Sequence, residues 1–413
     1  MDYFVPTNHT CKKVIIPPSK SYAQRAILAA SLCEDAVELS NLGKSEDVRY
    51  FLTMSKQLGA THQLEQNGNL IIQGFQNQRS PQLNAGESGL GLRLITGICA
   101  VLGSSYEIIG EGSLKKRPIR EFEHLLAQIG VSCTTKNGFL PLHIQGRAKG
   151  GQIHMDGSSG SQYLTSLLMA LPLAEDDSEI FVSSLSSIPY IDITLAVLND
   201  FGIHVTHDQY QHFKIQGGQQ YSRKRSYLVE GDYSGAANWI VYGALNDGIQ
   251  IEGLNPATHQ GDSAMLNVLS KAGVKFNWNN SSLTIEKSNI LPFDFDASQC
   301  PDLFPALVVL AAAAKGQSKI KGANRLIHKE SNRAQVLVKE FSSVGLNIAH
   351  IGDLLVIEGN GRLDSGCIHS NNDHRIAMAG AIAASLTPNG LTIQEAESVA
   401  KSYPEFWDNW TTR

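Results

Sequence analysis

The sequence predicts an α/β protein built from six copies of one repeat. Six apolar, helix-like runs each open on a small or polar cluster, and they recur about every 71 residues. The runs open at Pro18, Gly86, Gly157, Gly231, Cys300 and Asn372. A glycine between a helix end and a short β-like run keeps the same spacing, at Gly59, Gly130, Gly202, Gly273 and Gly345. Two independent markers with one period indicate a copied structural element.

Each repeat is expected to read strand, helix, strand, helix, strand. The first helix begins at the polar cluster, and the second ends at the recurring glycine, because glycine readily adopts the left-handed conformation of a helix C-cap. Alternation in segments such as VIIPPSK, IHMDGSS and FKIQG supplies the strand ends.

The length of the chain favours two domains of three repeats each. A chain of 413 residues exceeds what one hydrophobic core usually supports. The sixth repeat lacks a strand after LTIQEA, and the N-terminal segment VPTNHTCKKVIIP is expected to complete it. This closure predicts a discontinuous domain of residues 1–19 and 232–413 that holds both termini, with residues 20–231 as an inserted domain.

Composition argues against several other classes of protein. A net charge of −5 lacks the basic excess of a nucleic-acid binder. The longest apolar run, Ala306–Ala314, is too short to span a bilayer, and no signal peptide opens the chain. The six cysteines show no CxxC pattern and the thirteen histidines no ligand-like pairing, so we expect reduced thiols, no metal and a cytoplasmic location.

Several cations lie at expected helix starts. Lys20, Arg25, Arg93 and Arg375 fall in or near first turns, where the helix dipole disfavours positive charge unless an anion is present. Lys329 and Arg333 form a like-charge pair four residues apart. Any one of them could be a solvated surface charge. The whole set favours a site for an anionic ligand.

The chain resembles the enolpyruvyl transferases, and within them the shikimate-pathway branch. The resemblance runs from about Val14 to Phe406 and begins with PSKSYAQRAILAASL. Further motifs follow in family order: RPI, SQYLTSLLMALPLA, IPYIDITL, YLVEGDYSGAA, QGD, PDLFPAL, HKESNR, NDHRIAMA and KSYPEF. It implies two domains, each of three βαβαββ repeats in an inside-out α/β barrel, with the active site in the cleft between them.

The implied reaction moves the enolpyruvyl group of phosphoenolpyruvate to the 5-hydroxyl of shikimate 3-phosphate and releases phosphate, with no cofactor or metal. By the same resemblance, the residues that bind phosphoenolpyruvate are Lys20, Gly89, Arg117, Gln162, Arg333, Arg375 and Lys401. Those that bind shikimate 3-phosphate are Lys20, Ser21, Arg25, Ser161, Gln162, Ser187, Tyr190, Asp302 and Lys329. We expect a monomer that binds these small molecules and neither nucleic acid nor membrane.

Addition of a hydroxyl to the enol double bond of phosphoenolpyruvate requires one group that removes a proton from the hydroxyl and another that protonates the methylene carbon. The resemblance assigns the first role to Asp302 and leaves Lys20 and Glu330 as candidates for the second. For Asp302, an N-cap at a helix start is the alternative, because aspartate is a preferred cap.

The chain departs from the family pattern at a few positions. Glu87 and Leu90 stand where Asn and Thr are usual, beside Gly89, and Glu87 would repel an anion unless it turns toward a cation. Gly160 replaces a Ser, Ile188 a Lys, and Arg325 a small polar residue. Three alternatives stay open: an enolpyruvyl transferase acting on UDP-N-acetylglucosamine, an RNA 3′-phosphate cyclase, and a non-catalytic paralogue.

Overall fold

The computed structural model describes residues 1–76, 79–222, 226–327 and 329–411. The chain divides into two compact units. Unit 1 comprises Met1–Pro17 and Glu230–Arg413, and unit 2 comprises Pro18–Val229. The chain therefore leaves unit 1 after Pro17 rather than Ser19, and returns to it after Val229 rather than Gly231. Each unit has its own hydrophobic core.

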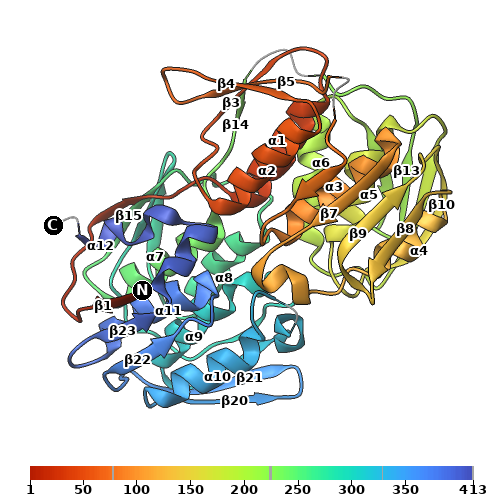
Figure 1. Ribbon diagram of the computed structural model, residues 1–413. Helices are drawn as coiled ribbons and strands as arrows, with labels where there is room; N and C mark the ends of the chain where they lie inside the picture. Colours follow the sequence, from red (N-terminus) through yellow and green to blue (C-terminus); the bar gives the residue numbers. More distant parts are fainter. Residues whose placement is uncertain (77–78, 223–225, 328, 412–413) are drawn as a thin grey trace. The chain divides into compact units, whose positions relative to one another are not determined.

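Unit 2 contains three repeats, each with a four-stranded sheet (Figure 1). Repeat 1 comprises α1 (Lys20–Leu32), β3 (Val37–Ser40), α2 (Glu46–Gln57), β4 (Thr61–Leu64), β5 (Leu70–Gln73) and β14 (Tyr227–Leu228). Repeat 2 comprises β6 (Gln82–Asn84), α3 (Gly89–Leu102), β7 (Ser105–Ile109), η1 (Gly112–Lys116), α4 (Glu121–Ala127), β8 (Ser132–Lys136) and β9 (Phe139–Gln145). Repeat 3 comprises β10 (Gly151–Asp156), α5 (Gln162–Ala170), η2 (Leu171–Leu173), β11 (Ser178–Ser183), α6 (Ile188–Asp200), β12 (Val205–Asp208) and β13 (His212–Ile215).

Unit 1 repeats the same plan. Repeat 4 comprises β2 (Lys13–Ile15), α7 (Tyr233–Leu245), β15 (Ile249–Glu252), η3 (Gly261–Ala264), α8 (Met265–Lys271), β16 (Phe276–Asn279) and β17 (Ser282–Ile285). Repeat 5 comprises β18 (Asp294–Asp296), η4 (Pro301–Leu303), α9 (Phe304–Ala313), β19 (Lys315–Lys321), η5 (Ala323–Leu326), α10 (Arg333–Ser343), β20 (Asn347–Ile351) and β21 (Leu354–Asn360). Repeat 6 comprises β22 (Gly366–His369), α11 (His374–Ala383), η6 (Ala384–Leu386), β23 (Leu391–Gln394), η7 (Ala396–Lys401), η8 (Pro404–Phe406), α12 (Asp408–Thr411) and β1 (Asp2–Val5).

The sheets share one topology. In repeat 2 the order is β6-β7-β9-β8, with β6 parallel to β7 and the other two pairings antiparallel. The same pattern recurs in repeats 1, 3, 4 and 5. Each of these repeats therefore ends in two antiparallel strands. This is the βαβαββ order that the family resemblance implied, with one strand more than the residue pattern alone predicted.

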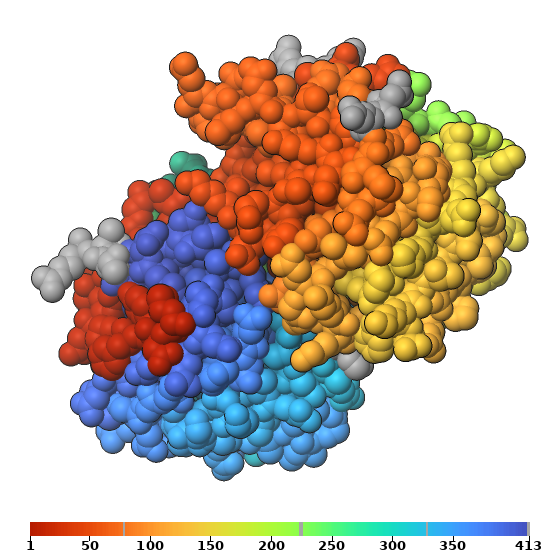
Figure 2. Space-filling model, viewed as in Figure 1, coloured from red at the N-terminus to blue at the C-terminus, as the bar shows by residue number. Residues whose placement is uncertain are grey.

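The N-terminal segment completes two sheets rather than one. The sixth sheet is closed by β1, which pairs antiparallel with β23, so the start of the chain (red) lies against the last repeat (blue) in Figure 2. Only Val5 of the segment expected to fill this place belongs to β1, and Lys13–Ile15 of that segment form β2, which pairs with β15 in repeat 4. The expectation was wrong in this detail because alternation over a few residues does not specify which sheet a short strand joins.

All five recurring glycines end helices as expected. Each has a positive φ, between 74° and 103°. At the first of them, the Gly59 N–H donates to Lys56 O and the Ala60 N–H to Ser55 O. These two bonds define a Schellman cap, and the same pair recurs at the other four glycines. Because glycine takes this conformation without strain and other residues do not, a glycine recurs at this position and marks the repeat in the sequence.

The first helix of each repeat packs inside its unit. Helices α1, α3 and α5 contact one another in sequence order in unit 2, and α7, α9 and α11 do so in unit 1. Every residue of α3 from Gly89 to Val101 is buried, which explains why its sequence is apolar all round apart from Arg93 and Thr96. Among the helices of the described residues, none combines the length and apolar composition needed to cross a bilayer.

Candidate active site

In unit 2 the three inner helices begin with expected site residues. Lys20, Gly89 and Gln162 are the first residues of α1, α3 and α5. Lys20 forms an ion pair with Asp47, in the first turn of α2, at 2.8 Å between Nζ and Oδ2. Each of these helix starts presents backbone N–H groups that can donate hydrogen bonds to an anion.

Arg25 is buried one turn into α1 and bonds to neutral oxygens. Its Nε donates to Thr194 Oγ1 at 2.9 Å, its Nη1 to Ser21 O at 2.8 Å, and its Nη2 to Tyr190 O at 3.2 Å. Burial lowers the pKa of Arg25 to about 10. Within the described residues no carboxylate forms an ion pair with it, so the guanidinium is a buried cation whose charge an anionic ligand would offset.

Gly89 and Arg117 lie in close contact. A Cβ added to Gly89 would lie 2.5 Å from Arg117 Nη1, so any larger residue would displace this guanidinium from its present position. The next residue, Pro118, accepts bonds from Tyr163 Oη at 3.2 Å and from Arg93 Nη2 at 3.5 Å. The guanidinium of Arg93 also stacks on the Tyr163 ring, at 5.0 Å. Arg93 and Tyr163 thus position the segment that carries Arg117.

The remaining residues of the unit 2 set surround the starts of α5 and α6. Ser161 and Ser187 occupy the N-cap positions of these helices and are buried, and Tyr190 is half-buried in the first turn of α6. Ser187 has a φ of 61°, in the left-handed region. Ser21 supplies the carbonyl that accepts from Arg25. The structure therefore collects all nine unit 2 candidates near helix starts or directly after η1.

The unusual residues beside Gly89 are part of the same region. Glu87 Oε2 accepts from the Ser113 N–H at 3.0 Å and from Ser113 Oγ at 2.8 Å, so this carboxylate binds the start of η1. Leu90 is 9% exposed. Gly160 has a φ of 132°, a conformation that L side chains rarely adopt, which gives a backbone reason for the missing Ser. Nothing in the structure explains Ile188 or Arg325.

In unit 1, Asp302 lies among three cations. Its Oδ1 is 2.9 Å from Arg333 Nη1 and 3.3 Å from Lys329 Nζ, and its Oδ2 is 3.0 Å from Arg375 Nη2. Burial acts to raise the pKa of Asp302, but Arg375, Lys329 and Arg333 together hold it well below its usual range. Asp302 lies inside η4, and the N-cap positions of η4 and α9 are Cys300 and Leu303. Its contacts therefore favour the electrostatic role over the cap.

Arg333 and Arg375 are held by carboxylates. The fully buried Arg333 bonds to Asp373 through Nε at 2.9 Å and to Glu330 through Nη2 at 2.7 Å. Burial acts to lower the pKa of Arg333, but Asp373, Glu330 and Asp302 raise it above its usual value. Asp373 also caps α11 by accepting the Arg375 N–H at 3.0 Å. This carboxylate thus links the two arginines.

Lys401 completes the unit 1 set. It is buried in η7, and its Nζ donates to the carbonyl of Asn372 at 2.9 Å, directly before the cap of α11. The unit 1 candidates therefore converge around η4 and the starts of α10 and α11. His328, in the HKESNR motif, lies outside the described residues.

Sequence reasoning missed Asp262, a buried carboxyl group in η3. It accepts a short hydrogen bond from Ser234 Oγ, on α7. Burial, together with the negative charge of Asp302, raises the pKa of Asp262 to about 7, although Arg375 acts in the opposite direction. The QGD motif was the only signal in the sequence, and it carries no information about burial. Asp373 was likewise read only as a cap.

Comparisons with known proteins identify the family of the chain. A family model described as EPSP synthase (3-phosphoshikimate 1-carboxyvinyltransferase) matches residues 6–410. The chain belongs to this family. A 3-phosphoshikimate 1-carboxyvinyltransferase of Clostridium perfringens (strain SM101 / Type A) is 36% identical over 402 residues, covering 96% of this chain and 94% of the relative. The protein of the same description from Clostridium acetobutylicum is 36% identical over 413 residues, covering 98% and 96%.

Solved structures of the EPSP synthase family have the same fold. An EPSP synthase from Acinetobacter baumannii matches with a TM-score of 0.84 and 26% identity, over 99% of this chain and 97% of that chain. The enolpyruvyl transferase NikO from Streptomyces tendae matches with a TM-score of 0.79 and 15% identity, over 99% and 96%, which shows the fold alone. The expected enolpyruvyl transferase fold is confirmed, and the chain is an enzyme of this family.

Proposed function

We propose that this enzyme transfers the enolpyruvyl group of phosphoenolpyruvate to the 5-hydroxyl of shikimate 3-phosphate, in the pathway to chorismate and the aromatic amino acids. The observation that carries the proposal is Asp302 among Lys329, Arg333 and Arg375, in a chain that belongs to the EPSP synthase family. Both substrates are phosphorylated carboxylates, which arginine forks and helix N-termini bind well.

The acceptor is assigned mainly to unit 2. Arg25 lies buried without a carboxylate partner among the described residues, and Ser161, Ser187 and Tyr190 offer neutral hydrogen-bonding groups at helix starts. Phosphoenolpyruvate is assigned to cations of both units: Lys20 and Arg117 from unit 2, and Arg333, Arg375 and Lys401 from unit 1. The substrates would draw the two units together around the reacting atoms.

The reaction proceeds by addition and elimination. A proton from Lys20 or Glu330 goes to the methylene carbon of phosphoenolpyruvate, and the 5-oxygen bonds to the adjacent carbon as Asp302 takes the hydroxyl proton. In the second step the new methyl group loses a proton, the carbon–carbon double bond re-forms, and phosphate leaves with the electrons of its C–O bond. The choice between Lys20 and Glu330 stays open.

Asp302 can act as a base only if the neighbouring cations stabilise its carboxylate less than they do in the protein without substrate. A carboxylate whose pKa lies well below its usual range accepts protons poorly. When the anionic groups of phosphoenolpyruvate bind Arg333 and Arg375, they share these cations with Asp302 and add negative charge beside it. Both changes raise the pKa of Asp302. Substrate binding thus activates the base.

We also propose that the enzyme acts as a monomer in the cytoplasm. Support for a reducing compartment comes from the cysteines, which in the described residues are present as thiols, five of them buried. Sedimentation of the purified protein tests the monomer, which predicts a mass near 44.8 kDa.

The direct test of the function is phosphate release from phosphoenolpyruvate with alternative acceptors. We expect release with shikimate 3-phosphate and none with UDP-N-acetylglucosamine. Release with the sugar nucleotide alone would assign the chain to the other branch, and release with neither acceptor would favour a non-catalytic paralogue.

A further inference from the structure

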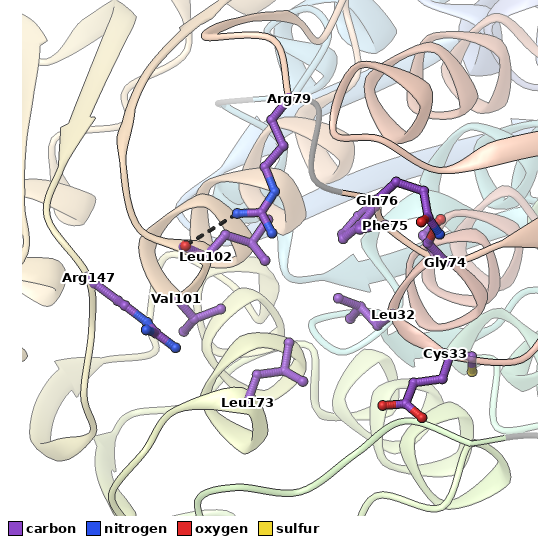
Figure 3. Close-up of a pocket in the computed structure, with 12 residues that line it drawn as sticks. Leu32, Cys33, Gly74, Phe75, Gln76, Arg79, Val101, Leu102, Arg147 and Leu173 are labelled. Carbon is purple, nitrogen blue, oxygen red and sulfur yellow. Dashed lines mark hydrogen bonds between the residues drawn. The ribbon is translucent and has the colours of Figure 1, made fainter.

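Unit 2 contains a second cavity, of about 570 Å³, at the ends of the inner helices opposite to the candidate site (Figure 3). Helix α1 ends at Leu32, α3 at Leu102, and η2, which continues α5, at Leu173, and all three residues line the cavity. At 1.5 Å per residue, the 13-residue α1 places this end about 20 Å from Lys20. The cavity is therefore separate from the residues assigned to catalysis.

The wall of the cavity opposite α3 is fixed to α1. The Phe75 N–H donates to Ser31 O at 3.0 Å, and a Cβ at Gly74 would lie 1.9 Å from the Cys33 carbonyl oxygen. This close backbone approach holds the segment against the helix end and presents Phe75 to the cavity. The wall is thus built into the fold.

The lining combines an apolar floor with two arginines and one carboxylate, that of Glu34. Figure 3 shows Arg79 and Arg147 on the side of Val101 and Leu102, with Leu32 and Phe75 facing them. Arg79 Nη1 donates to the carbonyl of Leu102 at 3.4 Å, a long bond at a helix C-terminus. Arg147 forms an ion pair of 3.4 Å with Glu175, in which both side chains are more than half exposed. Such an exposed pair is weak, so both guanidiniums are available to a ligand.

In unit 1 a segment of the chain covers the corresponding helix end. There residues 7–11 cross the end of α7: Thr7 Oγ1 donates to Thr387 O, and the Tyr242 hydroxyl donates to His9 O and accepts from the Cys11 N–H. The cavity at this place is about 250 Å³ and is lined largely by that segment. In unit 2 the described residues leave the larger space open.

We propose that the cavity of unit 2 binds a small amphipathic carboxylate. Its apolar body would pack against Leu32, Phe75 and Leu173, and its carboxylate would bind Arg79 and Arg147. The volume lies in the range of small-molecule sites, which combine apolar walls with a few placed charges. Inorganic phosphate would leave the apolar wall uncovered, and a neutral ligand would form no ion pair with the arginines, so each should bind more weakly.

The test uses 3-phenylpropionate and its amide as probes of the full-length protein. Titrations follow the methyl resonances of Leu32, Val101 and Leu173 by NMR. We expect these resonances to shift with the acid, and the acid to bind at least about tenfold more tightly than the amide, the effect of a charge-assisted hydrogen bond. Equal affinity for acid and amide, or shifts confined to other residues, would overturn the proposal.

Variants locate the binding. Arg79→Gln combined with Arg147→Gln should weaken acid binding at least about tenfold and leave amide binding unchanged. Both side chains are exposed, so the fold should survive, and Arg362→Gln is the matched control in unit 1. Leu173→Trp, which fills the cavity, should reduce binding of both probes. Unchanged acid affinity in the double variant, or displacement of the probe by shikimate 3-phosphate, would contradict the assignment.

Discussion

The arginines of the two units differ in what compensates their charge. In unit 2, Arg25 and Arg93 are buried among neutral oxygens, and burial lowers the pKa of both. In unit 1, Arg333 and Arg375 are equally buried, but carboxylates surround them and raise their pKa values above the usual one. The contrast supports the proposal that unit 2 gains an anion on substrate binding. In unit 1 we propose that an arriving anion weakens the hold of the cations on Asp302.

The largest expected effect comes from Asp302→Asn. This change keeps the shape of the side chain but removes the base, so turnover should fall by roughly 10²–10⁴, the usual contribution of general acid–base catalysis. Steady-state phosphate release measures it. Asp247→Asn, an exposed aspartate of the same unit, is the control and should keep wild-type turnover.

The variant Asp262→Asn tests how the charge of this buried carboxyl group affects the stability of unit 1, independently of catalysis. Because the pKa of Asp262 is raised to about 7, above its value in the unfolded chain, the wild-type protein loses stability as pH rises from about 4 through about 7. The amide stays neutral, so the variant should be more stable by about 2–4 kcal/mol at pH 8 and equal to wild type near pH 4. Chemical denaturation at both pH values measures this, with the exposed Asp35→Asn as control. A gain in stability that is the same at both pH values would contradict the raised pKa of Asp262.

Much of this architecture could be predicted from the sequence because the repeat is marked by a backbone requirement. The five cap glycines need a positive φ, and that need is local. The cations at helix starts could also be predicted, because the position of a charge relative to a helix start is a local feature of the sequence. The raised pKa of Asp262 and the uncompensated charge of Arg25 could not be predicted, because both arise from burial among elements distant in sequence.

The positioning of Arg117 was hidden for a related reason. Gly89 leaves space for its guanidinium, and the Arg93–Tyr163 pair holds Pro118, but these contacts join α3, α5 and the segment after η1. The pairing of β1 and β2 with two different sheets depended in the same way on tertiary packing.

A smaller effect is expected where the unit 2 site departs from the family. Glyphosate, an inhibitor of this family that is slightly longer than phosphoenolpyruvate, should be disfavoured by Glu87 and by the bulk of Leu90 beside Gly89. Glu87→Asn combined with Leu90→Thr should therefore tighten inhibition several-fold, as measured in competition with phosphoenolpyruvate. Because Glu87 binds Ser113, the variant Ser113→Ala tests whether loosening η1 alone produces the change. Strong inhibition of the native protein that the double variant does not tighten would refute this account.

The smallest expected effect is a change in dimensions. The two units are joined by two chain crossings, after Pro17 and after Val229, so a substrate that binds residues of both units should draw them together. Saturation with shikimate 3-phosphate should reduce the radius of gyration in small-angle scattering. An unchanged value with both substrates present would count against a site shared by the units.

The contrast between the arginines is tested most directly by calorimetric titration of shikimate 3-phosphate into Arg25→Gln and Arg333→Gln. Because Arg25 lies in the unit assigned to the acceptor and has no carboxylate partner among the described residues, its variant should lose about 10–100-fold in affinity. Arg333 is held by Asp373, Glu330 and Asp302, so its variant should bind shikimate 3-phosphate within about threefold of wild type. A larger loss in Arg333→Gln than in Arg25→Gln would contradict the division of roles between the two units.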